Sequence, residues 1–231
     1  MRRVPLSLLL LMTANLPVFT QAPVGVVQAA AGPELVALIG PFPTVDSDAG
    51  KADLAIVLWH QRTRSATDIQ RAMSEVKLGL GTYATSAGRP LDAGQFPKTA
   101  ALIDKVGKDI KAETDALKKH FGRPRPYLTD SRVQPAIERE TSPSYPSGHA
   151  TRGLAYALVL AELAPDRREA LLAVGRQVGV DRVIGGVHYP SDIEAGQRLS
   201  VRLTETWLAN PQNRSLVEAV RAAEWTTAGK P

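Results

Sequence analysis

The sequence predicts an all-α fold, a compact helical bundle in which loops carry the chemistry. Apolar residues recur at helical spacing in several segments, and the alternation typical of strands is nearly absent. With 231 residues, 44% of them hydrophobic, the chain can bury one sizeable core, and it has no internal repeat. We therefore expect a single domain over residues 32–231.

The N-terminus has the pattern of a secretory signal peptide. Two arginines precede the apolar run 4–19, and the small residues of "VQAAAG" fit cleavage after Ala29 or Ala31. Prolines and an asparagine interrupt the run, so it lacks the ~20 consecutive apolar residues of a membrane anchor, which is the alternative interpretation. Residues 1–31 are therefore predicted to be a signal peptide, and the mature protein to be periplasmic or secreted.

Composition limits the possible partners. The chain has no cysteine, so disulfides and thiolate metal sites are excluded. No later segment reaches spanning length, so we expect no stable membrane insertion after signal cleavage. The formal charge is +5, but the basic residues are dispersed among 23 acids and few aromatics accompany them, which argues against nucleic acid as a partner. The sequence leaves homo-oligomer formation open.

The sequence of the first half of the chain predicts three helices. The first covers 48–62, and the second follows the N-cap candidate Ser65, with apolar residues at helical spacing as far as Leu80. The loop 85–97 ends the second helix, because it is rich in turn-forming residues. A third amphipathic face follows this loop.

This third face runs from Ile103 to Lys118, and Pro124 and Pro126 stop the helix that carries it. Further helices are predicted over residues 151–164, 166–180, 191–208 and 212–223.

The stretch "SYPSGHATRG" combines a helix start with a histidine. Ser147 is a good N-cap, Gly148 lets the backbone approach a ligand closely, and His149 falls in the first helical turn. The N–H groups and dipole at such a terminus form an anion site. The alternative is an ordinary capped helix with an incidental histidine.

The stretch "KKHFGRPRPY" gathers cations on a stiff backbone. Lys118 and Arg125 stand seven positions apart with Arg123 between them, and a proline follows each arginine. Cations held close together suit a doubly negative group, which arginine binds through paired N–H donors. The alternative is a solvated basic end of a helix.

The stretch "DRVIGGVHYPSDIEAG" adds a second histidine. Arg182 precedes His188 by six positions across a glycine pair that breaks the helix, and Asp192 follows His188 by four. Ser191 and Glu194 form a capping-box pattern that places Asp192 in the first turn of a new helix. A carboxylate on one ring nitrogen would leave the other free as a nucleophile. A structural His–Asp pair is the alternative.

Together the three stretches closely resemble the tripartite signature of the type 2 phosphatidic acid phosphatase superfamily, and the exported form resembles bacterial class A nonspecific acid phosphatases. The resemblance implies a helical bundle of the acid phosphatase and vanadium haloperoxidase type. It also implies a metal-independent phosphomonoesterase that acts on small phosphate monoesters without a cofactor, through a phosphohistidine intermediate.

The resemblance assigns a role to each matching residue. His188 would be the nucleophile, Asp192 would orient it, and His149 would protonate the leaving alcohol. Cations would supply the charge that other phosphatases take from metal ions. The residues implied to bind phosphate are Lys118, Arg125, Ser147, Gly148 and Arg182.

Three positions depart from the family pattern. Asp181 stands where the family usually has serine, and it could weaken the local positive field. Pro143 and Ala150 flank the second motif where class A enzymes commonly carry glycine and threonine. These changes leave the chemistry intact and bear on class and substrate range.

The remaining candidates are weaker. Arg123 is expected to line the pocket, and His60 and His120 match no motif and are interpreted as structural or surface residues. Two alternatives use the same pocket, a vanadium-dependent haloperoxidase, which requires bound vanadate, and a lipid phosphate phosphatase. A third, a non-catalytic periplasmic phosphate-binding protein, explains the cations but not the His188–Asp192 pair.

Overall fold

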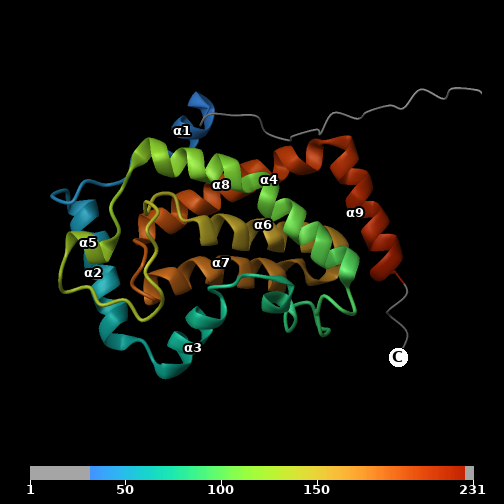
Figure 1. Cartoon of the computed structure of the whole chain (residues 1–231), viewed down its shortest axis with the longest axis horizontal. Coiled ribbons are helices and arrows are strands. Elements are labelled where there is room, and N and C mark those ends of the chain that lie inside the picture. The colour runs from blue at the N-terminus through green and yellow to red at the C-terminus, as the bar shows by residue number, and fades with distance from the viewer. Residues whose placement is uncertain (1–31, 227–231) are drawn as a thin grey trace, which may run out of the picture.

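The computed structural model describes residues 32–226, which form helices and no strand, as predicted (Figure 1). None of these helices is long and apolar enough to cross a bilayer. The predicted signal peptide lies outside the described residues. The helices are α1 (Pro33–Ile39), α2 (Asp48–Thr63), α3 (Ala66–Ser74), η1 (Leu80–Tyr83), α4 (Pro97–Phe121), α5 (Pro126–Thr129), α6 (Gly148–Leu163), η2 (Pro165–Arg167), α7 (Arg168–Ile184), α8 (Pro190–Ala209) and α9 (Pro211–Glu224).

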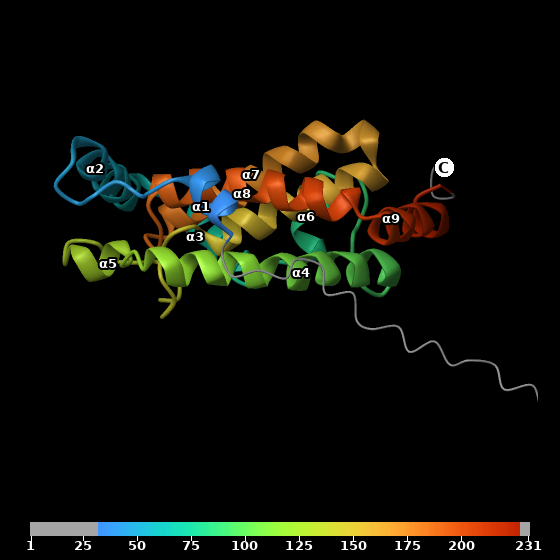
Figure 2. The ribbon, with the colours of Figure 1, turned by 90° about the horizontal axis from the view of Figure 1, so that it is seen from above.

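Helix α6 is the centre of the bundle. It contacts α4, α7, α8 and α9, and Figure 2 shows α4 running along one side of a layer that holds α6, α7 and α8. Its sequence is apolar around most of its circumference, and 12 of its 16 residues are buried. A helix that is hydrophobic on all sides is stable only inside a core.

Two glycines let α6 and α7 approach each other closely. A Cβ on Gly175 would lie 2.7 Å from the Ala157 Cβ and 2.8 Å from the Gly153 carbonyl oxygen. The two helices are antiparallel (Figure 1), so the N-terminus of α6 lies beside the C-terminus of α7. This contact brings the second and third sequence motifs to the same end of the bundle.

Helix α3 begins as predicted and ends early. Ser65 caps it, since its Oγ accepts the Asp68 N–H at 3.1 Å. The predicted continuation to Leu80 is wrong, because α3 stops at Ser74. Glycines on both sides of Leu80 disfavour a long helix, and Leu80 packs into the core from the short η1 instead.

The two helices that begin at the site have different caps. Ser147 caps α6 as predicted, accepting the Ala150 N–H at 3.3 Å. The predicted cap of α8 at Ser191 is wrong, because α8 already begins at Pro190, whose fixed φ suits the first helical position. The N–H of Tyr189 donates to Asp192 at 2.9 Å, so Asp192 closes this terminus.

Candidate active site

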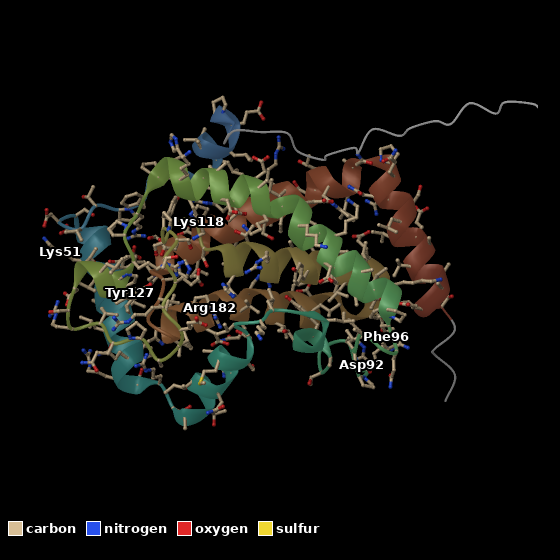
Figure 3. The ribbon with its side chains drawn as sticks, in the orientation of Figure 1. Lys51, Asp92, Phe96, Lys118, Tyr127 and Arg182 are labelled. Atoms are coloured by element: carbon tan, nitrogen blue, oxygen red, sulfur yellow. The ribbon has the colours of Figure 1, made fainter. Side chains whose placement is uncertain are left out.

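The predicted site residues converge at one end of the bundle. In Figure 3, Lys118 from α4 and Arg182 from α7 lie on either side of α6. The loop between α5 and α6 and the loop between α7 and α8 complete this end. All eight predicted site residues belong to it, and each is buried except the partly exposed Gly148.

His188 is held at both ring nitrogens. Its Nδ1 lies 3.1 Å from Asp192 Oδ2, as the spacing of four predicts, and Ser144 contacts both side chains. Its Nε2 lies 3.1 Å from Arg125 Nη1. A guanidinium can only donate, so Nε2 accepts this bond and the ring proton lies on Nδ1, toward Asp192. The expectation of a free second nitrogen is therefore wrong, since Arg125 occupies it.

The surroundings of His188 keep the ring neutral. Burial lowers the pKa of His188 to about 3, with Arg125 and Lys118 acting in the same direction against the hydrogen bond to Asp192. Burial alone would raise the pKa of Asp192, but its bond with His188 and the charge of Arg123 lower it to about 2. A neutral imidazole beside an ionised carboxylate is the state that a nucleophilic histidine needs.

Arg123 does not line the phosphate pocket, which corrects the sequence prediction. It is 4% exposed, and it donates to Asp192 Oδ1 at 2.6 Å and to Asp53 Oδ2 at 2.9 Å. Its guanidinium also lies 3.9 Å from the centre of the Tyr189 ring. Arg123 thus fixes the carboxylate that orients His188. Sequence reasoning missed Asp53, whose only signal is that it shares a face of α2 with the buried Val57.

Two cations lie near the start of α6. Lys118 donates to the Pro143 carbonyl, and burial together with the charge of Arg125 lowers its pKa to about 8. Arg182 donates to the Ala72 carbonyl at 2.6 Å, while its buried Nε has no hydrogen-bond partner among the described residues. A buried N–H without an acceptor is costly, so this atom is available to an anion.

The N-terminus of α6 adds backbone donors. The N–H groups of Gly148 and His149 precede the first hydrogen bonds of the helix, and such groups bind anions. A Cβ on Gly148 would lie 3.7 Å from Lys118 Cε, so the lysine stem passes directly over this turn. Ser147 stabilises the turn as its cap.

His149 is held less tightly than His188. Its Nε2 lies 3.2 Å from the Val76 carbonyl oxygen, which places the ring proton on Nε2. Its Nδ1 lies 3.6 Å from Glu140 Oε1. Burial, followed by the charges of Arg182 and Arg152, lowers the pKa of His149 to about 4.

Two adjoining pockets, of about 480 and 520 Å³, open onto this end of the bundle. Lys118 and Gly148 line the first pocket and Arg182 lines the second. Arg125 and His188, each 1% exposed, line neither pocket, but Arg125 contacts Glu140 and Ser142, which line both. Both pockets share Glu140, Ser142, His149 and Arg152.

Glu140 is a site residue that sequence reasoning missed. Its Oε2 accepts from Arg125 Nη2 at 2.7 Å. Burial would raise the pKa of Glu140, but Arg125 and the histidines His188 and His149 outweigh it and hold the pKa at about 2. Nothing in the charged run "IERETS" separates this glutamate from its exposed neighbours.

Asp181, the departure from the family pattern, is paired away from the pocket. It is fully buried, and it accepts from Arg71 Nε and Nη2 at 2.7 and 2.8 Å. The acid that pairs with Arg182 is a different one, Glu75, whose Oε2 lies 3.5 Å from Arg182 Nη2. Burial, followed by the charge of Asp181, raises the pKa of Glu75 to about 7.

The other histidines take no part in the site. His120 is exposed at the end of α4, and His60 is partly exposed on α2, where its ring packs edge-on against Trp59. Residues 32–226 contain no cluster of three His, Cys, Asp or Glu side chains that could hold a metal ion.

Comparison with known proteins identifies the family. Residues 104–215 match the PAP2 superfamily, and this region contains all eight predicted site residues. The part of the chain that carries the site therefore belongs to the PAP2 superfamily. Its all-α architecture is that of the PAP2 fold.

Relatives of this PAP2 chain include phosphatases. It is 37% identical over 138 residues to an acid phosphatase of Zymomonas mobilis, a match that covers 58% of this chain and 52% of the relative. This chain thus spans about half the length of the Zymomonas protein. It is 27% identical to a non-specific acid phosphatase of Providencia stuartii, over 77% of this chain and 75% of the relative.

A solved structure shares the fold. The transmembrane PAP2 type phosphatidylglycerolphosphate phosphatase of Bacillus subtilis superposes with a TM-score of 0.54, covering 80% of this chain and 93% of that one. At 21% identity this likeness concerns the fold alone.

Proposed function

We propose that this PAP2 protein is an exported acid phosphatase that hydrolyses small phosphate monoesters through a phosphohistidine. The observation that carries the proposal is the state of His188, a neutral imidazole with Nδ1 held by Asp192 and Nε2 beside Arg125. The names of the Zymomonas and Providencia relatives support the same activity.

The first step forms a phosphorus–nitrogen bond. The phosphoryl group binds among Lys118, Arg125, Arg182 and the N–H groups of α6, which stabilise the charge of the transition state. Arg125 Nη1 turns its N–H from His188 Nε2 to a phosphoryl oxygen, and the Nε2 lone pair then attacks phosphorus as the bond to the ester oxygen breaks. Protonated His149 donates a proton to the leaving oxygen, so the alcohol departs neutral. Asp192 stabilises the Nδ1–H of the charged phosphohistidine.

The second step returns the site to its starting state. A water molecule attacks phosphorus and breaks the bond to Nε2, while neutral His149 accepts the proton of the water. The products are inorganic phosphate and the alcohol, and no redox partner or metal enters the balance. The cations already supply the charge that a metal would provide in other phosphatases.

Hydrolysis of 4-nitrophenyl phosphate by the purified protein at mildly acidic pH tests the activity. We expect turnover that survives exhaustive chelation and competitive inhibition by orthovanadate, whose five-coordinate geometry mimics in-line attack. Loss of activity on chelation, restored by a divalent metal, would contradict the metal-independent mechanism. Halide oxidation by the vanadate-loaded protein, without ester hydrolysis, would instead identify a haloperoxidase.

Export is part of the proposal and has its own test. The charged start, the apolar run 4–19 and the small residues before Gly32 support cleavage. In a bacterial host we expect the protein in the periplasm, with an N-terminus near Ala30 or Gly32. N-terminal sequencing that finds intact Met1 on the purified protein would refute cleavage.

A further inference from the structure

Glu140 places a carboxylate inside the cationic site. Its Oε2 lies 2.7 Å from Arg125 Nη2, and its Oε1 lies 3.6 Å from His149 Nδ1. The mechanism proposed above uses both partners, one to bind phosphate and one to protonate the leaving group. A carboxylate oxygen thus sits where a phosphate oxygen would receive the same contacts.

The donors of Arg125 are fully occupied while Glu140 stays in place. Its five N–H groups meet five acceptors, so a phosphate oxygen gains a donor only by displacing one of them. The Glu140 carboxylate is the only charged group among the five. The acceptors are the Ser142 carbonyl for Nε (2.9 Å), the Val187 carbonyl and His188 Nε2 for Nη1 (both 3.1 Å), and Glu140 Oε2 (2.7 Å) and Ser142 Oγ (3.1 Å) for Nη2.

Glu140 can leave this position without refolding of the loop. Its main chain is fixed, because the Tyr127 hydroxyl donates to the Glu140 carbonyl at 2.6 Å. Its side chain is 36% exposed and lies between the two pockets, each of about 500 Å³. Rotation of the side chain into either pocket would free one Nη2 donor of Arg125.

We propose that Glu140 is an internal competitor of phosphate: in the ligand-free protein its carboxylate occupies the phosphoryl position, and each phosphate ligand binds by expelling it from Arg125. The inference rests on the proposed function, which identifies this site as the phosphoryl site. It assigns Glu140 a role in setting substrate and product affinity.

An internal competitor has a recognisable signature. It lowers the apparent affinity of every ligand of the site by one common factor, the fraction of molecules in which the site is free. Inorganic phosphate and the substrate are therefore affected equally. A residue that contacts only the leaving group would change KM and not phosphate binding, and an acid or base would change kcat.

The test measures phosphate binding by calorimetry and inhibition kinetics in Glu140→Gln. Glutamine keeps the shape and removes the charge, so one charge-assisted hydrogen bond to Arg125 is weakened and we expect phosphate to bind about tenfold more tightly. The KM for 4-nitrophenyl phosphate should fall by the same factor, with kcat changed by less than about threefold. Glu140→Ala, which removes the competing group altogether, should give an equal or larger gain.

Glu138→Gln is the matched control. It removes the same charge from the same loop: Glu138 is exposed and lines the second pocket, but it is not among the five acceptors of Arg125. Its phosphate affinity should stay within about twofold of the wild-type value. A gain in Glu138→Gln equal to that in Glu140→Gln would overturn the proposal, because a general change in surface charge would explain both.

The outcomes separate this inference from the proposed function. Unchanged or weaker phosphate binding in both Glu140 variants, with hydrolysis intact, would overturn the inference and leave the function standing. Tighter phosphate binding without ester hydrolysis in any of the proteins would support the inference and refute the function. Failure of the wild type and both variants to bind phosphate would refute both.

Discussion

The two histidines of the site are held in different ways. His188 is 1% exposed, with hydrogen-bond partners at both ring nitrogens, and its carboxylate partner Asp192 is itself held by Arg123. His149 lines both pockets, and its contact to Glu140 is long, at 3.6 Å. The His188 side of the site is therefore fixed before a ligand binds, whereas the His149 side is adjustable.

This difference matches the two halves of a phosphoryl transfer. A nucleophile gains from a preset tautomer and direction, because misplacement by a fraction of an ångström costs rate. A general acid must meet leaving groups of different size, so a looser setting beside open space is useful. Substitutions on the fixed side should therefore lower the turnover of every substrate, and those on the adjustable side should change how turnover depends on substrate and pH.

His188→Ala should have the largest effect. We expect kcat to fall by at least about 10⁴-fold, since no other group can form the phosphohistidine. Phosphate binding, measured by calorimetry, should survive within about tenfold, because Lys118, Arg125 and Arg182 remain. Turnover near that of the wild type would refute the assignment of the nucleophile.

His149→Asn should reduce turnover less, and unevenly. Hydrolysis of an alkyl phosphate should slow by about 10²–10³-fold, and that of 4-nitrophenyl phosphate by much less, because a general acid matters most for a basic leaving oxygen. Equal losses on both substrates would count against the role.

The pH profile provides a second measurement on this variant. His149 must be protonated to act and its pKa in the free protein is about 4, so kcat/KM for the alkyl phosphate should fall as pH rises above about 4, once substrate ionisation is divided out. His188 must be neutral and its pKa is about 3, so activity should also fall below about pH 3. The fall at higher pH should be absent from His149→Asn.

Arg123→Gln tests how the fixed side is built. It leaves the buried carboxylates of Asp53 and Asp192 without their cation, so the free energy of unfolding should drop by about 3–5 kcal/mol. The kcat should fall by about 10–100-fold, as for other partners that orient a reacting group, with phosphate affinity nearly unchanged.

Arg132→Gln is the control for this variant, since Arg132 is an exposed arginine near in sequence that pairs with Asp130. Its unfolding free energy should change by less than about 1 kcal/mol in chemical denaturation. Equal losses of stability in the two variants, or wild-type kcat in Arg123→Gln, would show that Arg123 does not position the site.

The sequence predicts the reacting groups of this site because their arrangement is local. The Ser147 cap places His149, a glycine pair ends α7 before His188, and a spacing of four brings Asp192 to the imidazole. Each of these rules needs only a few consecutive residues.

The supporting contacts could not be predicted in the same way. Arg123 pairs with Asp53 across 70 residues, and Arg71 pairs with Asp181 across 110. Such pairs depend on how helices pack, which no local pattern encodes. The error at the end of α3 has the same origin, because His149 and Arg182 bind residues that would have belonged to its predicted extension, Val76 and Glu75.

Asp181→Asn should have the smallest effect on the site, although the sequence suggests that Asp181 weakens the positive field. Arg71 balances the charge of Asp181. Burial raises the pKa of Glu75, and the charge of Asp181 raises it further, to about 7. When Asp181 becomes neutral, the pKa of Glu75 should fall, so that Glu75 ionises near pH 6. The negative charge of Glu75 then replaces the one lost at Asp181.

We therefore expect calorimetry at pH 6 to find the phosphate affinity of Asp181→Asn within about twofold of the wild type, while loss of a charge-assisted bond lowers the unfolding free energy by about 1–3 kcal/mol. The double variant Asp181→Asn/Glu75→Gln removes the compensating charge, and phosphate should then bind several-fold more tightly, because the cations that remain attract it without opposition. A large gain in the single variant would show instead that Asp181 acts directly on the site. Asp181 and Glu75 would then oppose phosphate binding, as Glu140 does, instead of only holding Arg182 in place.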